Sequence, residues 1–362
     1  MPPVMGAAAF LMADLTAIPY GNIAMAAALP AVLCYAVLFN QAERFGRRIE
    51  VQAATDPVAA GAGEAARTYQ LSPASLLHIL PAAGIIWVLM NNDTDSEGAG
   101  MLGTALALLV ALVLRGPRKT LRHLVEIAPR AAQTVSNLVV AGATLGVVLA
   151  VMGSTGLDVK GALAISHVGE SSLLLSLLMT AAAAFVLGMG VSTSGVYLIT
   201  GTLLAPGLVK LGVPLIAAHF FVFYCGMLSM ITPPVAFAAL AASGLVGASF
   251  RATSFEAMKF GWILFLLPFL IVYAPGLLLE GGFLAIARDL LAAVACVAAL
   301  VVWPGRGATG GRRGLGLVAL LAAGAAVFGP LPGGAAMQAG LCLLSLAISA
   351  GLLLRHRAAQ PA

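Results

Sequence analysis

The sequence predicts an all-α, polytopic membrane protein with inverted repeats, broken helices and a re-entrant hairpin. Hydrophobic residues make up 61% of the chain and charged residues 9%, whereas soluble domains are about half apolar and roughly a quarter charged. The mean hydropathy is +1.02. Apolar runs long enough to cross a hydrocarbon core of ~30 Å recur along the chain, and two Pro-Pro pairs interrupt such runs.

The apolar runs define the predicted spans. Shorter runs at 196–210 and 315–329 are predicted to be marginal spans or re-entrant segments. The longer runs lie near 21–41, 74–91, 99–115, 131–152, 171–187, 213–248, 258–279, 283–303 and 335–353.

Charges between the runs predict the orientation of the spans. The connecting stretch 115–130 holds five Lys and Arg against one Glu, and 91–98 holds three acids and no base. Because cytoplasmic loops are enriched in Lys and Arg, 115–130 is predicted to face the cytoplasm. The net charge of +5 therefore reflects membrane orientation, and nucleic acid is not expected as a partner.

A repeat is visible around the two Pro-Pro pairs. At an offset of 231 residues, five of eight positions are identical between 2–9 and 233–240. Farther on, LPAVLCYA (29–36) matches LPFLIVYA (267–274) as L-P-x-x-x-x-Y-A. The charge pattern makes the helices that carry Pro30 and Pro268 antiparallel, which is typical of the inverted repeats of secondary transporters.

The Pro-Pro pairs predict broken helices. Proline lacks an N–H and its ring clashes with the preceding turn. Within a membrane such a break persists only where it lines a cavity or is buried in protein, and its carbonyl oxygens and half-helix ends can bind ions and substrate carboxylates. A simple kink without an ion is the alternative. Thr232, directly before Pro233, favours the ion-binding interpretation.

A Gly-rich stretch, LGMGVSTSGVYLITGTLLAP (187–206), lies upstream of the second break. Glycines here permit a non-helical turn, and three successive hydroxyl side chains supply oxygen atoms within an apolar run. The pattern predicts a re-entrant hairpin whose tip contains Gly188, Gly190 and Ser192 to Gly195. The alternative is a small-residue face for close helix packing.

The motifs GMG-x-x-T-x-x-x-Y (188–197), L-x-V-P-x-x-A-A-H-x-F-V-F-Y-x-G (211–226) and ITPPVA (231–236) resemble the large membrane subunit of TRAP (tripartite ATP-independent periplasmic) transporters, of the fused 4TM/12TM permease type. MPPVMGAAAFLMA resembles the corresponding break in the first half of that subunit. The resemblance covers about residues 1–280, and it departs from the family pattern at Ser192, where such permeases usually have Pro.

The resemblance implies a sodium-driven importer of small organic anions, carboxylates such as C4-dicarboxylates, in the bacterial inner membrane. Its implied partners are a periplasmic solute-binding protein and a small membrane subunit, and its coupling ion is Na⁺. Ser192 and Ser194 are candidates for contact with the substrate. The implied sodium ligands are Gly188, Gly190, Thr193, Thr232 and Pro233 at the second site, and Pro2 and Pro3 at the first.

The position of Pro2-Pro3 predicts an incomplete first repeat. The equivalent of 171–232 would precede it, so the chain is expected to be an N-terminally truncated permease that does not transport alone. The expected parts are a first-repeat remnant (1–42), a cytoplasmic linker (43–73), scaffold spans (74–152), the second repeat (153–280) and a C-terminal tail of two to three spans (281–362).

Other interpretations remain open. FEAMKFGWILFLLP (255–268) resembles the docking loop of an ABC importer permease, but the spacing from Gly261 to Leu267-Pro268 is short for that loop, and such a permease would not need the inverted Pro-Pro copies. A membrane enzyme is disfavoured because no HExxH motif or paired intramembrane carboxylates are visible. A non-transporting structural subunit is a third alternative. The four cysteines and His219 are predicted to serve packing or hydrogen bonding.

Overall fold

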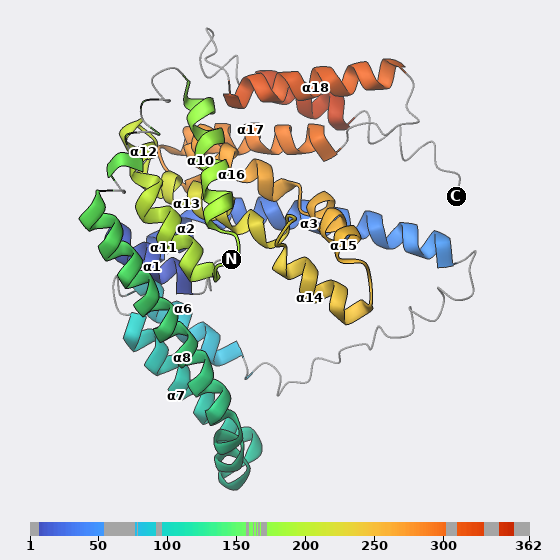
Figure 1. Ribbon diagram of the computed structural model, residues 1–362. Helices are drawn as coiled ribbons and strands as arrows, with labels where there is room; N and C mark the ends of the chain where they lie inside the picture. The colour runs from blue at the N-terminus through green and yellow to red at the C-terminus, as the bar shows by residue number, and fades with distance from the viewer. Residues whose placement is uncertain are drawn as a thin grey trace.

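The computed structural model consists of helices joined by short turns (Figure 1). It describes residues 7–53, 79–91, 96–156, 172–301, 310–328 and 340–350, together with a few single positions between these ranges. Over these residues the chain contains no β-strand, in agreement with the predicted all-α class.

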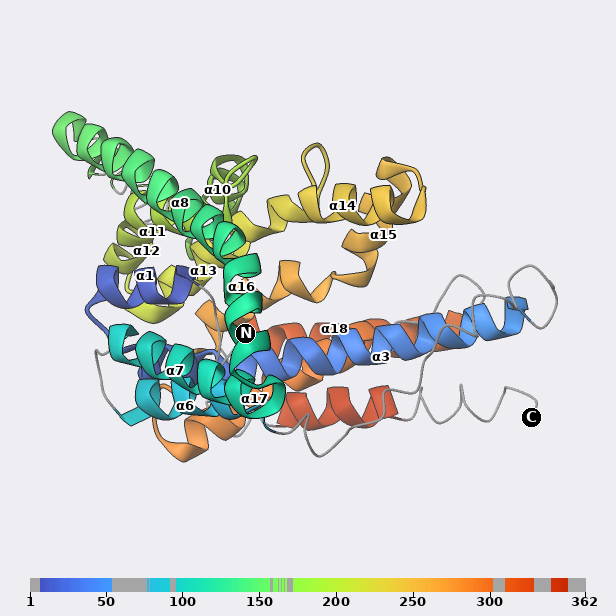
Figure 2. The same cartoon turned by 90° about the horizontal axis from the view of Figure 1, so that it is seen from below.

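The first part of the chain forms two helical groups. After the first Pro-Pro pair come α1 (Ala7–Thr16), α2 (Tyr20–Ala26) and the long α3 (Ala28–Ala53). The next group contains α6 (Ile79–Asn91), α7 (Ser96–Arg115) and α8 (Pro117–Thr155). The tight pair α6 and α7 lies beside α8 at one side of the molecule in both views (Figures 1 and 2).

The second part of the chain has shorter helices. Its order is α10 (Leu173–Leu187), α11 (Thr193–Leu203), α12 (Ala205–Lys210), α13 (Leu215–Met227), the 3₁₀ turn η2 (Leu228–Met230), α14 (Phe237–Val246), α15 (Phe250–Phe260), α16 (Ile263–Tyr273) and the 3₁₀ turn η3 (Pro275–Leu278).

Within the described ranges, four helical segments are long and apolar enough to cross a membrane. They are Tyr20–Glu43, Gly98–Arg115, Phe250–Tyr273 and Phe283–Val301. Shorter apolar helices, such as Leu173–Leu187 and Leu215–Met230, accompany them. The chain is therefore a multi-pass membrane protein, as its composition predicts.

The buried core surrounds α13, which packs against α10, α11, α12 and α16. Phe220 and Phe221 of α13 are fully buried, and the Phe221 ring packs edge-on against Phe269 of α16 with 5.3 Å between centroids. All four cysteines are buried and free, which agrees with their predicted packing role. The hairpin formed by α10 and α11 packs against this buried centre.

The helices that follow the two Pro-Pro pairs have matching starts. The first residue of α14 lies 230 positions after the first residue of α1 (237 and 7). The first residues of α15 and α2 (250 and 20) are also 230 positions apart. Pro30 lies near the start of α3, and Pro268 lies inside α16. The correspondence that the sequence suggested between the two regions therefore extends to the order and the starting positions of their first two helices. The helices α1 and α14 each have 10 residues, whereas α2 has 7 and α15 has 11.

Two stretches that the sequence predicts to be connections between spans contain helix. The basic stretch 115–130 was expected to be a connection between spans, but α8 incorporates it from Pro117 onward. Arg, Lys, Leu and Glu are good helix formers, so charge alone does not interrupt the helix. In the same way, α3 continues to Ala53, inside the expected linker 43–73; the rest of that linker, 54–73, lies outside the described residues.

The C-terminal segment packs on the end of the second part. It contains α17 (Phe283–Val301), α18 (Gly310–Phe328) and the helix Gly340–Ala350. α17 and α18 run side by side above α16 in Figure 1. Both helices bury alanine residues, for example Ala293 of α17 and Ala323 and Ala326 of α18, and such small side chains let helix backbones approach closely.

Candidate functional site

The predicted hairpin is formed by α10 and α11. At a rise of ~1.5 Å per residue, neither the 15-residue α10 nor the 11-residue α11 reaches across a hydrocarbon core of ~30 Å. Both helices pack against α13, and α11 also packs against α1. The two arms therefore behave as a re-entrant unit held by the core and not as two separate crossings.

The hairpin tip is a short non-helical turn between the arms. Gly188 caps the C-terminal end of α10, and Gly190 has a φ of +78°, a conformation that glycine adopts without steric cost. Ser192 then begins α11: its backbone is extended, and its hydroxyl accepts a weak bond from the Gly195 N–H at 3.4 Å. The departure from the family pattern at Ser192 thus places a helix-capping hydroxyl where a rigid ring is usual.

The second break separates α13 from α14. The chain leaves α13 through η2, passes the Pro233-Pro234 pair, whose peptide bond is cis, and enters α14 after Ala236. Ala236 has a φ of +40°, a strained backbone conformation for a residue with a side chain. Its N–H donates to the Ser229 carbonyl oxygen at 3.2 Å, and this bond closes the loop.

The tip and the break are in direct contact. The Ser229 hydroxyl lies 2.8 Å from the carbonyl oxygens of both Gly188 and Gly226, and its single proton can be donated to either one. A Cβ atom on Gly188 would overlap the Gly226 carbonyl oxygen. Position 188 must therefore be a glycine for the end of α10 to approach α13 this closely.

Several oxygen atoms at this junction have no described hydrogen-bond donor. The Thr232 hydroxyl is buried and has no partner within the part of the chain that the structure describes. The carbonyl oxygens of Thr232, Pro233 and Pro234 accept no backbone hydrogen bond from a described residue. In the tip, the carbonyl oxygens of Met189 and Gly190 likewise accept no backbone hydrogen bond from a described residue.

These oxygen atoms fit a small cation that prefers oxygen ligands. A buried hydroxyl without a partner costs about 1–3 kcal/mol, and a coordinated Na⁺ would remove that cost. Carbonyl oxygens at a helix break are the ligand type that sodium sites in membrane transporters use. The Gly188 oxygen remains available as well, because a carbonyl oxygen that accepts from Ser229 has a second lone pair.

The predicted site residues fall into two groups. Gly188, Thr232 and Pro233 lie at the junction of the tip and the break, whereas Gly190, Thr193 and Ser192 are exposed on the tip. Ser194 is half-buried in the first turn of α11. Pro2 and Pro3 lie outside the described residues.

Sequence reasoning missed Ser229 and Gly226, which join the tip to the break. Ser229 lies three residues before Thr232 inside an apolar run. A polar residue so close to a predicted helix break could have marked Ser229 as a candidate site residue. Gly226 belongs to a motif that the resemblance used, but its close approach to Gly188 is a tertiary contact that no local pattern shows.

A buried polar pair ties the second arm of the hairpin to the core. The Tyr197 hydroxyl of α11 lies 2.8 Å from Nδ1 of His219 in α13, and both residues are buried. The Tyr197 ring also packs edge-on against Phe223. The prediction that His219 is a packed or hydrogen-bonded histidine is therefore confirmed.

Comparison with known families and proteins identifies the family of the chain. The family model for the DctM component of tripartite ATP-independent periplasmic transporters matches residues 1–280. Comparisons with curated proteins and with solved structures gave no significant match. The matched range contains the hairpin and the broken helix, ends before α17 begins, and makes up more than half of the chain. The chain therefore belongs to the DctM family, the large membrane component of TRAP transporters.

Proposed function

We propose that this TRAP permease subunit couples the import of small organic anions, carboxylates such as C4-dicarboxylates, to the entry of Na⁺ across the bacterial inner membrane. A periplasmic binding protein delivers the anion, and a small membrane subunit completes the system. The family match supports the role of permease subunit and decides against the ABC importer alternative. The ion and the solute class rest on the junction between the tip and the break.

The observation that carries the sodium proposal is the buried Thr232 hydroxyl without a described partner. It lies in the same turn as the uncommitted carbonyl oxygens of Pro233 and Pro234, and Ser229 holds this turn against Gly188. Na⁺ bound there would be held by Thr232, by carbonyl oxygens of the break and by the tip at Gly188 to Gly190. Such an ion would supply positive charge where the protein has none, because 187–206 contains no charged residue.

The anion proposal rests on the start of α11 beside this junction. The first N–H groups of a helix carry partial positive charge and favour a carboxylate. Ser192 and Ser194 add hydroxyl groups in the same turn. With Na⁺ at the junction, a carboxylate at this helix end would be attracted by both the ion and the helix dipole, so ion and anion would bind cooperatively.

Sodium-dependent stabilisation of the purified full-length chain tests the ion site without requiring transport. Thermal unfolding in detergent is compared in sodium chloride and in choline chloride at equal ionic strength. A ligand at about a hundred times its Kd stabilises the folded state by about 2.7 kcal/mol, so we expect a clear rise in Tm with Na⁺. Thr232→Val should abolish the rise and leave Tm in choline unchanged or higher, because the buried hydroxyl is removed.

Thr232→Ser is the matched control, since it keeps the hydroxyl and should keep the sodium response. An equal sodium response in Thr232→Val would contradict the assigned site. The absence of any response in the unsubstituted chain would instead favour the alternative of a non-transporting structural subunit. If succinate raises Tm further only when Na⁺ is present, the cooperative anion site is supported; an equal effect in choline would argue against it.

A further inference from the structure

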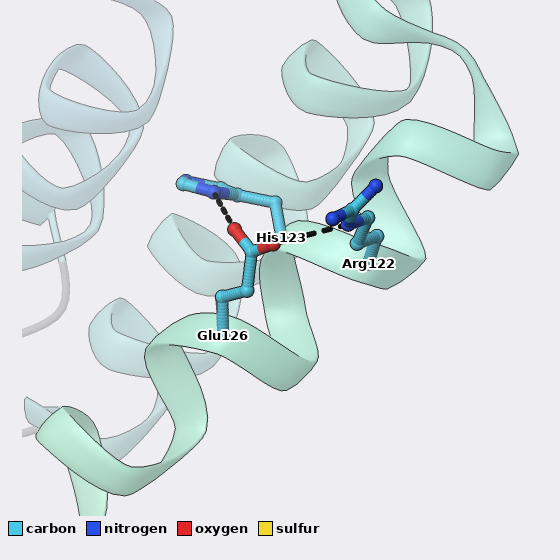
Figure 3. Close-up of polar contacts among 3 residues, drawn as sticks. All are labelled: Arg122, His123 and Glu126. Atoms are coloured by element: carbon cyan, nitrogen blue, oxygen red, sulfur yellow. Dashed lines mark hydrogen bonds and ion pairs between the residues drawn. The ribbon is translucent and has the colours of Figure 1, made fainter.

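The first part of α8 is a basic amphipathic helix. Arg118, Arg122, Glu126 and Arg130 follow one another at intervals of four residues, with Lys119 beside them, so the charges share one face. In Figure 3 the Arg122 and His123 side chains both reach the Glu126 carboxylate, at 3.2 Å and 3.9 Å. One Glu does not neutralise this face, since 115–130 holds five Lys and Arg.

The opposite face of this helix is apolar and exposed. Leu121 and Val125, four residues apart, are 66% and 67% exposed, and Leu124 is 40% exposed. A helix with one basic face and one apolar face, neither of which packs against the rest of the protein, is typical of segments that lie in the membrane interface. In water alone, the apolar face would lose the stabilisation that burial gives.

The ends of the segment place it along the membrane surface. α7 ends at Arg115, and the Thr120 hydroxyl lies 2.9 Å from the Ala111 carbonyl oxygen, which holds the start of α8 against the end of α7. From Ala131 to Thr155 the helix contains no charged residue, so we expect it to enter the apolar core there, as the sequence predicts for 131–152. Both ends of 117–130 thus lie at the same membrane face. Because a 14-residue helix is ~21 Å long, it can keep both ends at one face only if it lies along the membrane surface.

A bend in α8 makes this arrangement possible. The helix contains Pro129, which lacks an N–H and whose ring clashes with the carbonyl group four residues earlier. Figure 2 shows α8 changing direction along its length. The segment before the bend is therefore free to lie along the surface while the remainder crosses the membrane.

We propose that 117–128 is an interfacial helix that binds anionic phospholipid headgroups. Arg118, Lys119 and Arg122 face the phosphate groups, and Leu121, Leu124 and Val125 lie at the boundary with the acyl chains. The charge pattern favours this occupant, because polybasic segments next to a membrane span are attracted to anionic lipids. An acidic partner protein is the competing occupant.

Spin labels on the two faces of the full-length chain test the proposal. Nitroxides are placed at Leu121→Cys and at Glu126→Cys; the four native cysteines are buried, and the unsubstituted chain checks that they stay unlabelled. In vesicles of phosphatidylcholine and phosphatidylglycerol, we expect the Leu121 position to be accessible to oxygen and protected from a water-soluble nickel relaxant. The Glu126 position should show the opposite pattern.

Charge reversal separates headgroup binding from simple apolar contact. Arg118→Glu with Lys119→Glu and Arg122→Glu should shift the balance of surface-bound and free segment toward the free form, by about a hundredfold or more at ~1 kcal/mol per basic residue. Phosphatidylcholine alone should give a smaller shift in the same direction. If the Leu121 label is accessible to nickel in the mixed vesicles, the face is open to water and suited to a protein partner, and the proposal is wrong. It is also wrong if neither the charge reversal nor the lipid change alters the accessibility.

Discussion

The Ser229 hydroxyl lies 2.8 Å from the Gly188 carbonyl oxygen and joins the broken helix to the hairpin tip across 41 residues of chain. This contact places two non-helical backbone segments side by side at the proposed ion site. If the ion binds at their junction, it must hold the hairpin and the break together. The stability of this contact and the affinity for Na⁺ should therefore change together.

Ser229→Ala should weaken the junction without enlarging any side chain. The loss of one buried hydrogen bond costs about 0.5–1.5 kcal/mol, and the Gly188 carbonyl oxygen would lose its donor. We expect a lower Tm in choline and a higher sodium concentration for half-maximal stabilisation. Ser243→Ala is the control, because that hydroxyl bonds only within its own helix, to the Leu240 carbonyl oxygen. Equal sodium responses in the two variants would show that Ser229 has no part in the site.

Gly188→Ala should separate the tip from α13. The added Cβ would overlap the Gly226 carbonyl oxygen, and a backbone atom in a packed core moves only at a cost of about 1–3 kcal/mol. Thermal unfolding should show that loss, and the sodium response should decrease. Gly146→Ala in α8 is the comparison, since nothing lies within 4 Å of the added atom; it should be neutral or stabilising by up to ~1 kcal/mol. A Gly188→Ala variant as stable as Gly146→Ala would refute the close packing.

The Tyr197 and His219 pair should behave as one energetic unit. Tyr197→Phe leaves the buried Nδ1 of His219 without the 2.8 Å partner, which costs about 1–3 kcal/mol. A double-mutant cycle with His219→Leu should give a coupling energy near the ~0.6 kcal/mol average for hydrogen bonds between membrane helices, and at most ~1.7 kcal/mol. The measurement is thermal or chemical unfolding of the four proteins in one detergent. A coupling energy of zero would mean that the bond adds nothing to the hold of α11 on α13.

Asp289 should matter for the attachment of the C-terminal helices. This buried carboxylate accepts the Gly276 N–H at 2.9 Å and lies 2.8 Å from Nη2 of Arg288. Asp289→Ala leaves a buried N–H and a guanidinium group without their partner, so we expect a loss of about 1–3 kcal/mol. Asp289→Asn keeps an acceptor oxygen and should lose less.

The exposed pair of Glu256 and Lys259 is the control for Asp289. Its side chains are 60% and 68% exposed, and such surface pairs contribute little. Glu256→Gln should therefore change stability by less than ~0.5 kcal/mol. If Asp289→Ala were equally mild, the contact between η3 and α17 would not be what holds the C-terminal segment in place.

Much of the fold follows from local chemistry. Long apolar runs predict membrane helices because the lipid core requires internally bonded backbone, and the Pro-Pro pair predicts the break because proline cannot continue the ladder. The hairpin tip was predictable from the glycines around Ser192. The helical state of 117–130 was not, because its charges marked a boundary between spans while its residues still favoured helix.

The sequence by itself determined the class of protein, the positions of the hairpin tip and the break, and the residue types that could bind an ion. These features depend on backbone bonding and hydropathy over a few neighbouring residues. Only the tertiary structure decided that Ser229 and Gly226 meet Gly188, and that the Thr232 hydroxyl is buried without a described partner. Such contacts depend on how α10 packs against α13, and residues far apart in the chain carry no local signal of their distance in space.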